Sequence, residues 1–241
     1  VGSDSDKARS MFAFTMLSLA INYWVSHNKK APDEPFIYFL NYKPLRDSYF
    51  IDAPGLLATK FLTKYVKNIP ISNPSEIKNT IQKLYSISLN THGSTLNENK
   101  YLMVFGYQRA EDLKSEDKAA EKQDIMSMMS SKTQGSMHSM KEMVEVILTM
   151  GAQNGVHSVF WQDDFKALDF ADRKLITYFY QKIAFDMQKE DYSQFVGVND
   201  ISQFGENTAV YNNRIDDTRS FRPYQSPDKE WLETVCNALN Q

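Results

Sequence analysis

The first residues of the chain form a segment that could bind a phosphate group. An apolar helical pattern starts at Ala8, and the turn before it consists of Gly2, Ser3, Asp4, Ser5, Asp6 and Lys7. A helix that begins behind a strand and a turn offers backbone N–H groups and the positive end of its dipole to an anion. The position and shape of this turn therefore suit the phosphates of a nucleotide.

The side chains of this turn differ from those of a working phosphate loop, which has the pattern GxxxxGK[ST]. The second glycine is absent, Lys7 comes one position early, and Ala8 replaces the hydroxyl residue that would hold magnesium. Asp4 and Asp6 would repel an anion. A simpler interpretation is also open, in which Ser5 or Asp6 only caps the following helix.

A second candidate position follows the apolar run 101–105. In an ATP-hydrolysing motor the corresponding strand ends at the Walker B acid, which orients magnesium, and a second carboxylate positions water. Here the strand end consists of Phe105, Gly106, Tyr107 and Gln108. Neither the position of the Walker B acid nor that of the second carboxylate is acidic here. Glu111 and Asp112 come too late in the sequence to lie at the end of the strand. This substitution predicts that ATP hydrolysis is weak or absent.

Other residues that could do chemistry give weaker patterns. The spacing of the four histidines is not typical of metal ligands; they are His27, His92, His138 and His157. Cys236 is the only cysteine, which excludes an intrachain disulfide and a zinc site made of several cysteines. The sequence contains no GxSxG or GxGxxG motif. We therefore assign no metal site and no catalytic residue.

The candidate positions need strands that end next to one another, and the sequence predicts such strands. Apolar and β-branched runs predict strands at Phe36–Leu40, Tyr101–Phe105, Val156–Trp161, Phe179–Met187 and Thr208–Tyr211. Helical spacing predicts helices at Ala8–Val25, Pro54–Tyr65, Asn73–Ile87, Ser136–Met150 and Asp228–Val235. The first of these helices is apolar on nearly every face and is expected to be buried on most sides. The alternation predicts an α/β fold, a predominantly parallel sheet with helices on both faces.

The organisation along the chain predicts a single domain over residues 1–241. Residues 114–135 are charged, then rich in methionine and serine without a clear period, which predicts a mobile loop. The methionines at 126–150 are typical of core filling, and less so of an adaptable partner surface. Val1 and Gly2 have the pattern of a strand that enters a turn, and we expect the chain to be a piece of a longer polypeptide.

The composition favours a globular, cytoplasmic protein. The chain has 241 residues, of which 42% are hydrophobic, and a formal net charge of -3. No apolar run approaches the roughly 20 residues of a membrane helix, so we expect no membrane contact from this region. The basic residues are scattered and do not form the stripe that is typical of proteins binding duplex DNA on their own.

A family resemblance emerges from the segment Gly151–Trp161, in which a helix ends in a small-residue turn and a Gly-Val-His strand follows. This segment resembles the FtsK/SpoIIIE family of P-loop motor proteins. Further segments resemble the family in the same order: Val1–Lys7 an eroded phosphate loop, Val104–Leu113 a degenerate Walker B region, Lys182–Phe185 the Lys-Ile-Ala strand, and Phe221–Leu232 the closing segment.

The resemblance implies a RecA-like P-loop NTPase fold and ATP-driven translocation of double-stranded DNA, or of protein, by ring-shaped assemblies. It implies ATP with magnesium as cofactor, and other domains or subunits of the parent motor as partners. Contact with DNA is implied by this kinship alone. The implied site comprises the phosphate loop Gly2–Lys7, the Walker-B-like strand end Phe105–Gln108, and the sensor-like pair Gln162 and Asp163, which stand where active relatives have Thr-Gln.

Three functional hypotheses follow. In the first, the chain is a degenerate motor domain with a structural or regulatory role in a larger translocase, and it binds nucleotide weakly or not at all. In the second, it is an ATPase whose missing acids come from neighbouring subunits. In the third, it is a docking domain whose 114–135 loop becomes ordered on a protein partner.

Overall fold

A computed structural model of the chain describes residues 1–2, 5–42, 60–89, 98–116, 138–166, 174–198, 208–213, 218–223 and 228–239. In these residues a parallel four-stranded sheet has the order β2-β1-β3-β4. Its strands are β1 (Ile37–Asn41), β2 (Val66–Pro70), β3 (Lys100–Phe105) and β4 (Val156–Trp161). The predicted strands at β1, β3 and β4 are confirmed.

The central strands are apolar on both faces because both faces are covered. Ile37, Phe39 and Leu40 of β1 are fully buried, as are the residues from Leu102 to Phe105 of β3. A strand with helices on each side needs such a continuous apolar run. The uninterrupted hydrophobic sequence therefore predicted these strands correctly.

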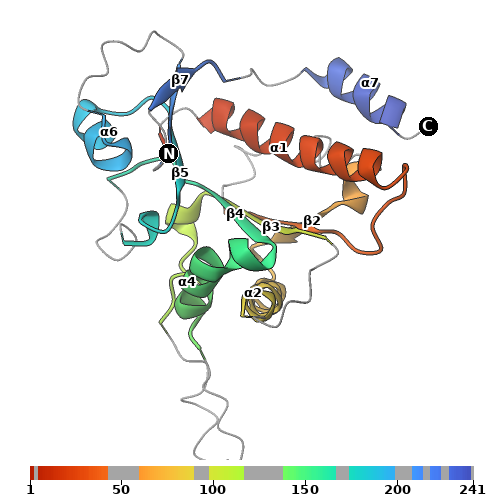
Figure 1. Cartoon of the computed structure of the whole chain (residues 1–241), viewed down its shortest axis with the longest axis horizontal. Coiled ribbons are helices and arrows are strands. Elements are labelled where there is room, and N and C mark those ends of the chain that lie inside the picture. The colour runs from red at the N-terminus through yellow and green to blue at the C-terminus, as the bar shows by residue number, and fades with distance from the viewer. Residues whose placement is uncertain are drawn as a thin grey trace, which may run out of the picture.

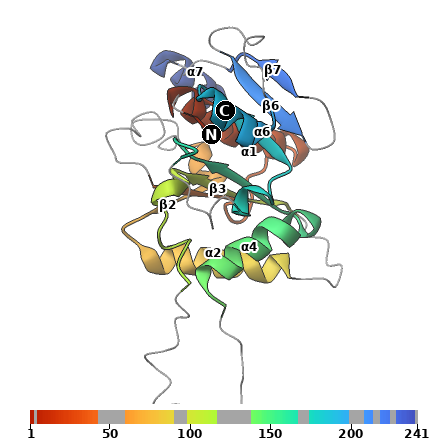
Figure 2. The ribbon, with the colours of Figure 1, turned by 90° about the vertical axis from the view of Figure 1, so that its left-hand side faces the viewer.

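Helices cover the two faces of the sheet, which confirms the predicted α/β architecture. The first helix, α1 (Ser5–Ser26), lies on one face, and α2 (Pro74–Ser88) and α4 (Met140–Met150) lie on the other (Figures 1 and 2). On one side Phe12 and Met16 pack with Phe39 and Phe105. On the other side the apolar residues of α2 and α4 pack against alternate residues of β1 and β3.

Polar side chains determine where the helices under the sheet begin. At α2 the side chain of Asn73 accepts a hydrogen bond from the backbone N–H of Glu76, at 3.3 Å. At α4, Ser139 and Glu142 form a reciprocal capping box. This cap explains why α4 begins at Met140 and not at Ser136, which lies outside the described residues.

The predicted helix Pro54–Tyr65 is wrong in the part that the structure describes. Residues 62–64 form a single 3-10 turn, and the strand β2 begins directly afterwards at Val66. Only Val66 and Ile69 of β2 are buried, and Pro70 ends it, so the strand lacks the apolar run of its neighbours. An edge strand tolerates both the polar residues and the proline. Residues 54–59, and 117–135 of the predicted loop, lie outside the described residues.

A second, antiparallel sheet follows in the order β5-β6-β7. It consists of β5 (Gln181–Ala184), β6 (Ala209–Asn213) and β7 (Arg219–Phe221), and the helix α6 (Lys189–Val196) packs beside it. The strands β5 and β6 were predicted, whereas β7 and α6 were not. The closing helix α7 (Lys229–Leu239) was predicted, and Asp228 caps its first turn.

The outer face of α1 is only half-buried, and this differs from the expectation of burial on most sides. Phe14 contacts Trp231 of α7, with ring centroids 5.8 Å apart, so α7 covers part of this face (Figure 1). Val25, near the end of α1, is 63% exposed. Within the described parts of the chain, no helix combines the length and the apolar character needed to cross a membrane.

Candidate functional site

The residues Val1 and Gly2 lie between β4 and β5, at the edge where the parallel strands end. The amino group of Val1 donates to the carbonyl oxygen of Ile183 at 2.7 Å, and the N–H of Phe185 donates to the carbonyl oxygen of Val1 at 2.8 Å. On the other side the N–H of Gly2 donates to the carbonyl oxygen of Gln162 at 3.2 Å. The two residues thus make strand-like hydrogen bonds to both neighbours.

Gly2 is required by close packing. Its φ is +142°, and a Cβ atom at this position would lie 2.8 Å from Cβ and 2.9 Å from the carbonyl carbon of Phe185. Backbone atoms cannot move away as a flexible side chain can. The glycine that the sequence assigns to a phosphate loop therefore also allows the chain to pass beside β5.

Behind this turn, α1 begins at Ser5, so that the last residues of the predicted phosphate loop, 5–7, lie in the helix. Lys7 is half-buried, whereas Ala8 is only 1% exposed and belongs to the core cluster that contains Phe12 and Phe105. The position that would carry the magnesium-binding hydroxyl is therefore occupied by a core methyl group. Ser3 and Asp4 lie outside the described residues, as do the side chains of Ser5 and Asp6.

The end of β3 turns sharply at Gly106, which has a φ of +85° in the left-handed region. Its N–H donates to the carbonyl oxygen of Trp161 at 3.1 Å. Phe105 and Tyr107, on either side of it, are buried, and Tyr107 packs on Phe160 with ring centroids 5.2 Å apart. Two of the four residues predicted at this strand end are thus core residues.

Three donors from the ends of β3 and β4 converge on the carboxylate of Asp163. Gln108 Nε2 lies 2.7 Å and Arg109 Nη1 3.1 Å from Oδ2, and the indole Nε1 of Trp161 donates to Oδ1 at 2.8 Å. The structure therefore brings together Gln108 and Asp163, which the sequence assigned to separate motifs. The sequence prediction missed Arg109, whose only sign was a basic residue directly after the predicted site.

Gln162 has a different environment from Asp163, although the sequence paired them. Its side chain is 4% exposed, and its Nε2 donates to the carbonyl oxygen of Asp164 at 2.8 Å. Its backbone carbonyl is the acceptor of the Gly2 hydrogen bond. Gln162 thus stabilises the local turn and positions Gly2, whereas Asp163 connects the two strand ends.

The described residues of this site do not suit a metal ion. The N–H of Gly2 is bonded to the carbonyl oxygen of Gln162, and Lys7 and Arg109 are cations among the described residues of the candidate site. Both oxygens of Asp163 already accept hydrogen bonds. Among the residues that the structure describes, no group of three or more histidine, cysteine or acidic side chains could hold a metal ion.

Two solved structures have a similar fold. One is the cytoplasmic domain of the Type VII Secretion ATPase EccC of Thermomonospora curvata, with a TM-score of 0.58, 13% identity, and coverage of 99% of this chain and 27% of that chain. The other is EssC (ATPases 2 and 3) from Geobacillus thermodenitrificans, with a TM-score of 0.57, 10% identity, and coverage of 99% and 42%.

At these identities the likeness establishes the fold alone, and it agrees with the α/β fold predicted from the sequence. The chain spans about a quarter of the EccC structure and about two fifths of the EssC structure. No protein-family model matches the sequence, and no curated protein is significantly similar to it.

Proposed function

We propose that this chain is a motor-type ATPase domain, of the kind found in FtsK/SpoIIIE-like translocases, that has lost ATP hydrolysis. It binds nucleotide weakly or not at all and has a structural or regulatory role beside other domains or subunits. The observation that carries the proposal is the end of β3, where Gln108 follows the strand and its amide is hydrogen-bonded to Asp163.

The geometry of β4 supports this interpretation of the strand end. The consecutive carbonyl oxygens of Trp161 and Gln162 accept hydrogen bonds from Gly106 on one side and Gly2 on the other. Gly106, after β3, and Gly2 are therefore held at adjacent positions along the end of β4. A carboxylate at the end of β3 would face the phosphate turn across β4, whereas Gln108 offers a neutral amide.

A bound magnesium ion would bridge the phosphates of ATP and neutralise charge in the transition state. The described residues fit this ion poorly. Ala8 is in the core, and Gln108 Oε1, although buried and without a hydrogen-bond partner among the described residues, is uncharged. Loss of such charge stabilisation raises a reaction barrier by several kcal/mol.

Titration calorimetry and steady-state ATPase assays of the purified chain test the proposal, with Lys7→Ala as the matched control. We expect no tight, magnesium-dependent binding and no turnover above that of the Lys7→Ala variant. Turnover of roughly 1–100 s⁻¹, the range typical of kinases, that is lost in the Lys7→Ala variant would refute it. Tight magnesium-dependent binding without turnover would favour an ATPase completed by neighbouring subunits.

The proposal does not specify whether the parent motor would move DNA or protein. A role in moving DNA has only the sequence resemblance behind it, while one of the two similar structures is named as a secretion ATPase. Association with other domains has more support, because both similar chains are much longer than this one. Filter binding to duplex DNA tests the cargo: with a net charge of -3 we expect no strong, salt-sensitive binding by the isolated chain.

A further inference from the structure

The chain folds back over the carboxyl end of α1 and exposes two lysines there. The N–H of Lys29 donates to the carbonyl oxygen of Trp24 at 2.7 Å, and the N–H of Lys30 donates to that of His27 at 3.1 Å. This turn requires left-handed backbone angles at Asn28 and Lys29, whose φ values are +52° and +64°. The ammonium group of Lys29 consequently lies 5.1 Å from the centroid of the Trp24 ring, and both lysines are exposed.

The turn before β2 brings two further lysines to the same place. Phe61 is buried and meets the Trp24 ring edge-on, with ring centroids 6.4 Å apart, so this turn lies beside the end of α1 (Figure 1). Lys60 and Lys64, on either side of Phe61 in the sequence, are exposed. The neighbour of Trp24 in α1, Val25, is 63% exposed. We call the exposed residues around this contact the basic patch: Val25, Lys29, Lys30, Lys60 and Lys64.

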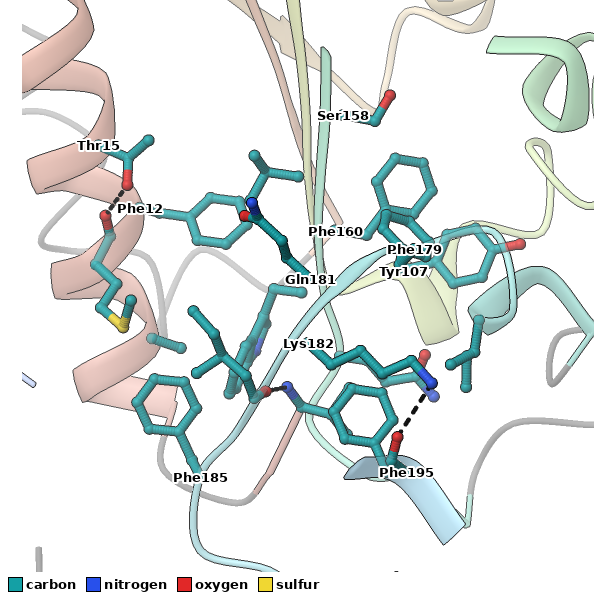
Figure 3. A pocket seen from close by; sticks show the side chains of 18 of the residues that line it. Phe12, Thr15, Tyr107, Ser158, Phe160, Phe179, Gln181, Lys182, Phe185 and Phe195 are labelled. Atoms are coloured by element: carbon teal, nitrogen blue, oxygen red, sulfur yellow. Dashed lines mark hydrogen bonds between the residues drawn. The ribbon is translucent and has the colours of Figure 1, made fainter. Parts of the chain in front are cut away.

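The four lysines of the basic patch differ from other lysines of the molecule in having no ion pair. Lys67, in the adjacent strand, pairs with Glu76 at 2.9 Å, and Lys182, in the apolar pocket between β4 and β5, donates to the carbonyl oxygen of Phe195 at 3.1 Å (Figure 3). Among the described residues, no acidic side chain forms an ion pair with a patch lysine. Asp33 is exposed nearby, but one carboxylate cannot neutralise four lysines. The patch therefore attracts an anionic partner.

The aromatic rings at this end of the molecule offer little surface for stacking with nucleic-acid bases. Tyr23 already stacks with His27 and with Phe36, at centroid distances of 3.9 Å and 5.1 Å. The Trp24 ring is half-buried and has a lysine ammonium over it. Proteins that bind single-stranded nucleic acid combine cations with open ring faces. The exposed apolar group here is instead the aliphatic side chain of Val25, which gains free energy from burial in lipid.

We propose that the basic patch binds the surface of a membrane rich in anionic phospholipids. The lysines contact the phosphate groups, and Val25 enters the boundary between the headgroups and the acyl chains. Binding of this kind depends on buried apolar area and on attraction to anionic lipids, and it needs no membrane-spanning helix. The absence of a long apolar run, from which we expected no membrane contact, concerns spanning segments only. The inference does not depend on nucleotide binding.

The attraction is local, so the net charge of -3 of the whole chain does not prevent it. At 0.1 M salt the interaction of exposed charges is largely screened beyond about 10 Å. Each lysine that reaches an anionic surface strengthens binding about fivefold. Four neighbouring lysines thus outweigh the acidic residues on more distant parts of the molecule.

Cosedimentation of the chain with vesicles of phosphatidylcholine and phosphatidylserine in equal parts tests the proposal. We expect binding that weakens as salt is added and that is absent with phosphatidylcholine alone. Replacing two patch lysines, Lys60→Gln with Lys64→Gln, should lower the partition coefficient roughly 25-fold. The matched control, Lys174→Gln with Lys189→Gln, removes the same charge from exposed lysines outside the patch and should change it less than about twofold. Equal losses in the two double variants, or no binding to the anionic vesicles, would overturn the proposal.

A further variant, Val25→Ser, separates a lipid surface from a nucleic-acid surface. We expect it to lower vesicle binding about threefold or more, because an apolar group is no longer buried. The same variant should leave binding to a single-stranded oligonucleotide unchanged. Undiminished vesicle binding by Val25→Ser, or tighter binding of the parent chain to the oligonucleotide than to the vesicles, would contradict the proposal. Since the replaced side chains are all exposed, each variant should keep the Tm of the parent chain.

Discussion

Two glycine turns flank the carboxyl end of β4, and different forces hold them. Gly106 donates to the carbonyl oxygen of Trp161, the last residue of β4, and Gly2 donates to that of Gln162, the next residue. Contact with the backbone of Phe185 constrains Gly2, whereas side-chain hydrogen bonds to Asp163 hold the turn after Gly106. Core packing thus holds the backbone at Gly2, whereas side-chain hydrogen bonds hold the turn after Gly106, so the two turns can change independently.

A substitution at Gly2, the turn constrained by packing, should give the largest loss of stability. Gly2→Ala places a Cβ against the backbone of Phe185, and we expect the free energy of unfolding to fall by about 2–4 kcal/mol. Gly197→Ala is the matched control, because its φ is also positive at +75° but no atom lies within 4 Å of the added Cβ. It should cost about 1 kcal/mol. Urea unfolding measures both, and equal losses would show that packing does not constrain Gly2.

A change of intermediate size is expected when pH alters the charge of the Val1 amino group, which lies next to Gly2. The pKa of the Val1 amino group is about 5 in the folded chain and near 8.0 when unfolded, so between these values the unfolded chain binds more protons. Stability should therefore rise as pH increases from 5.5 to 7.5, by about 1–2 kcal/mol.

N-terminal acetylation removes the titrating group and leaves the four histidines in place. We expect the acetylated chain to lose this part of the pH dependence in urea unfolding. The same slope in both chains would mean that the amino group is not buried.

Substitutions at the turn after Gly106, which side-chain hydrogen bonds hold, should give the smallest losses of stability. Asp163→Ala leaves the donors of the half-buried Gln108 and the buried Trp161 without their acceptor, and we expect a loss of about 1–2 kcal/mol in urea unfolding. Arg109→Ala removes only a cation whose side chain is 44% exposed, and it should cost at most about 0.5 kcal/mol. A loss for Arg109→Ala as large as that for Asp163→Ala would show that charge, rather than hydrogen bonding, holds this turn.

The parts of the fold that the sequence predicted are those in which local pattern and tertiary burial agree. The apolar runs of β1 and β3 require cover on both faces, and Asn73 with Glu76 gives a local start signal for α2. The strand β2 was missed because Lys67 and Asn68 interrupt its apolar pattern. An edge position permits this, and the edge position is not visible in the sequence.

The candidate site was predictable only in outline. The sequence located the turn at Gly2 and the strand end at Gln108, yet it could not join Gln108 to Asp163, which is 55 residues away. That contact depends on the order of strands in the sheet. Nor could the sequence place Tyr107 in the core, because apolar residues after a strand occur on surfaces as well.

Trp161 can serve as an intrinsic fluorescence probe of the region around the two glycine turns. Its indole is hydrogen-bonded to Asp163, stacks beside Phe105 with ring centroids 6.2 Å apart, and meets the ring of Phe185 edge-on at 5.3 Å. It is 3% exposed, whereas Trp231 is 42% exposed. Emission from the buried indole is consequently sensitive to movement of either glycine turn, so that intrinsic fluorescence can follow events there without an attached label.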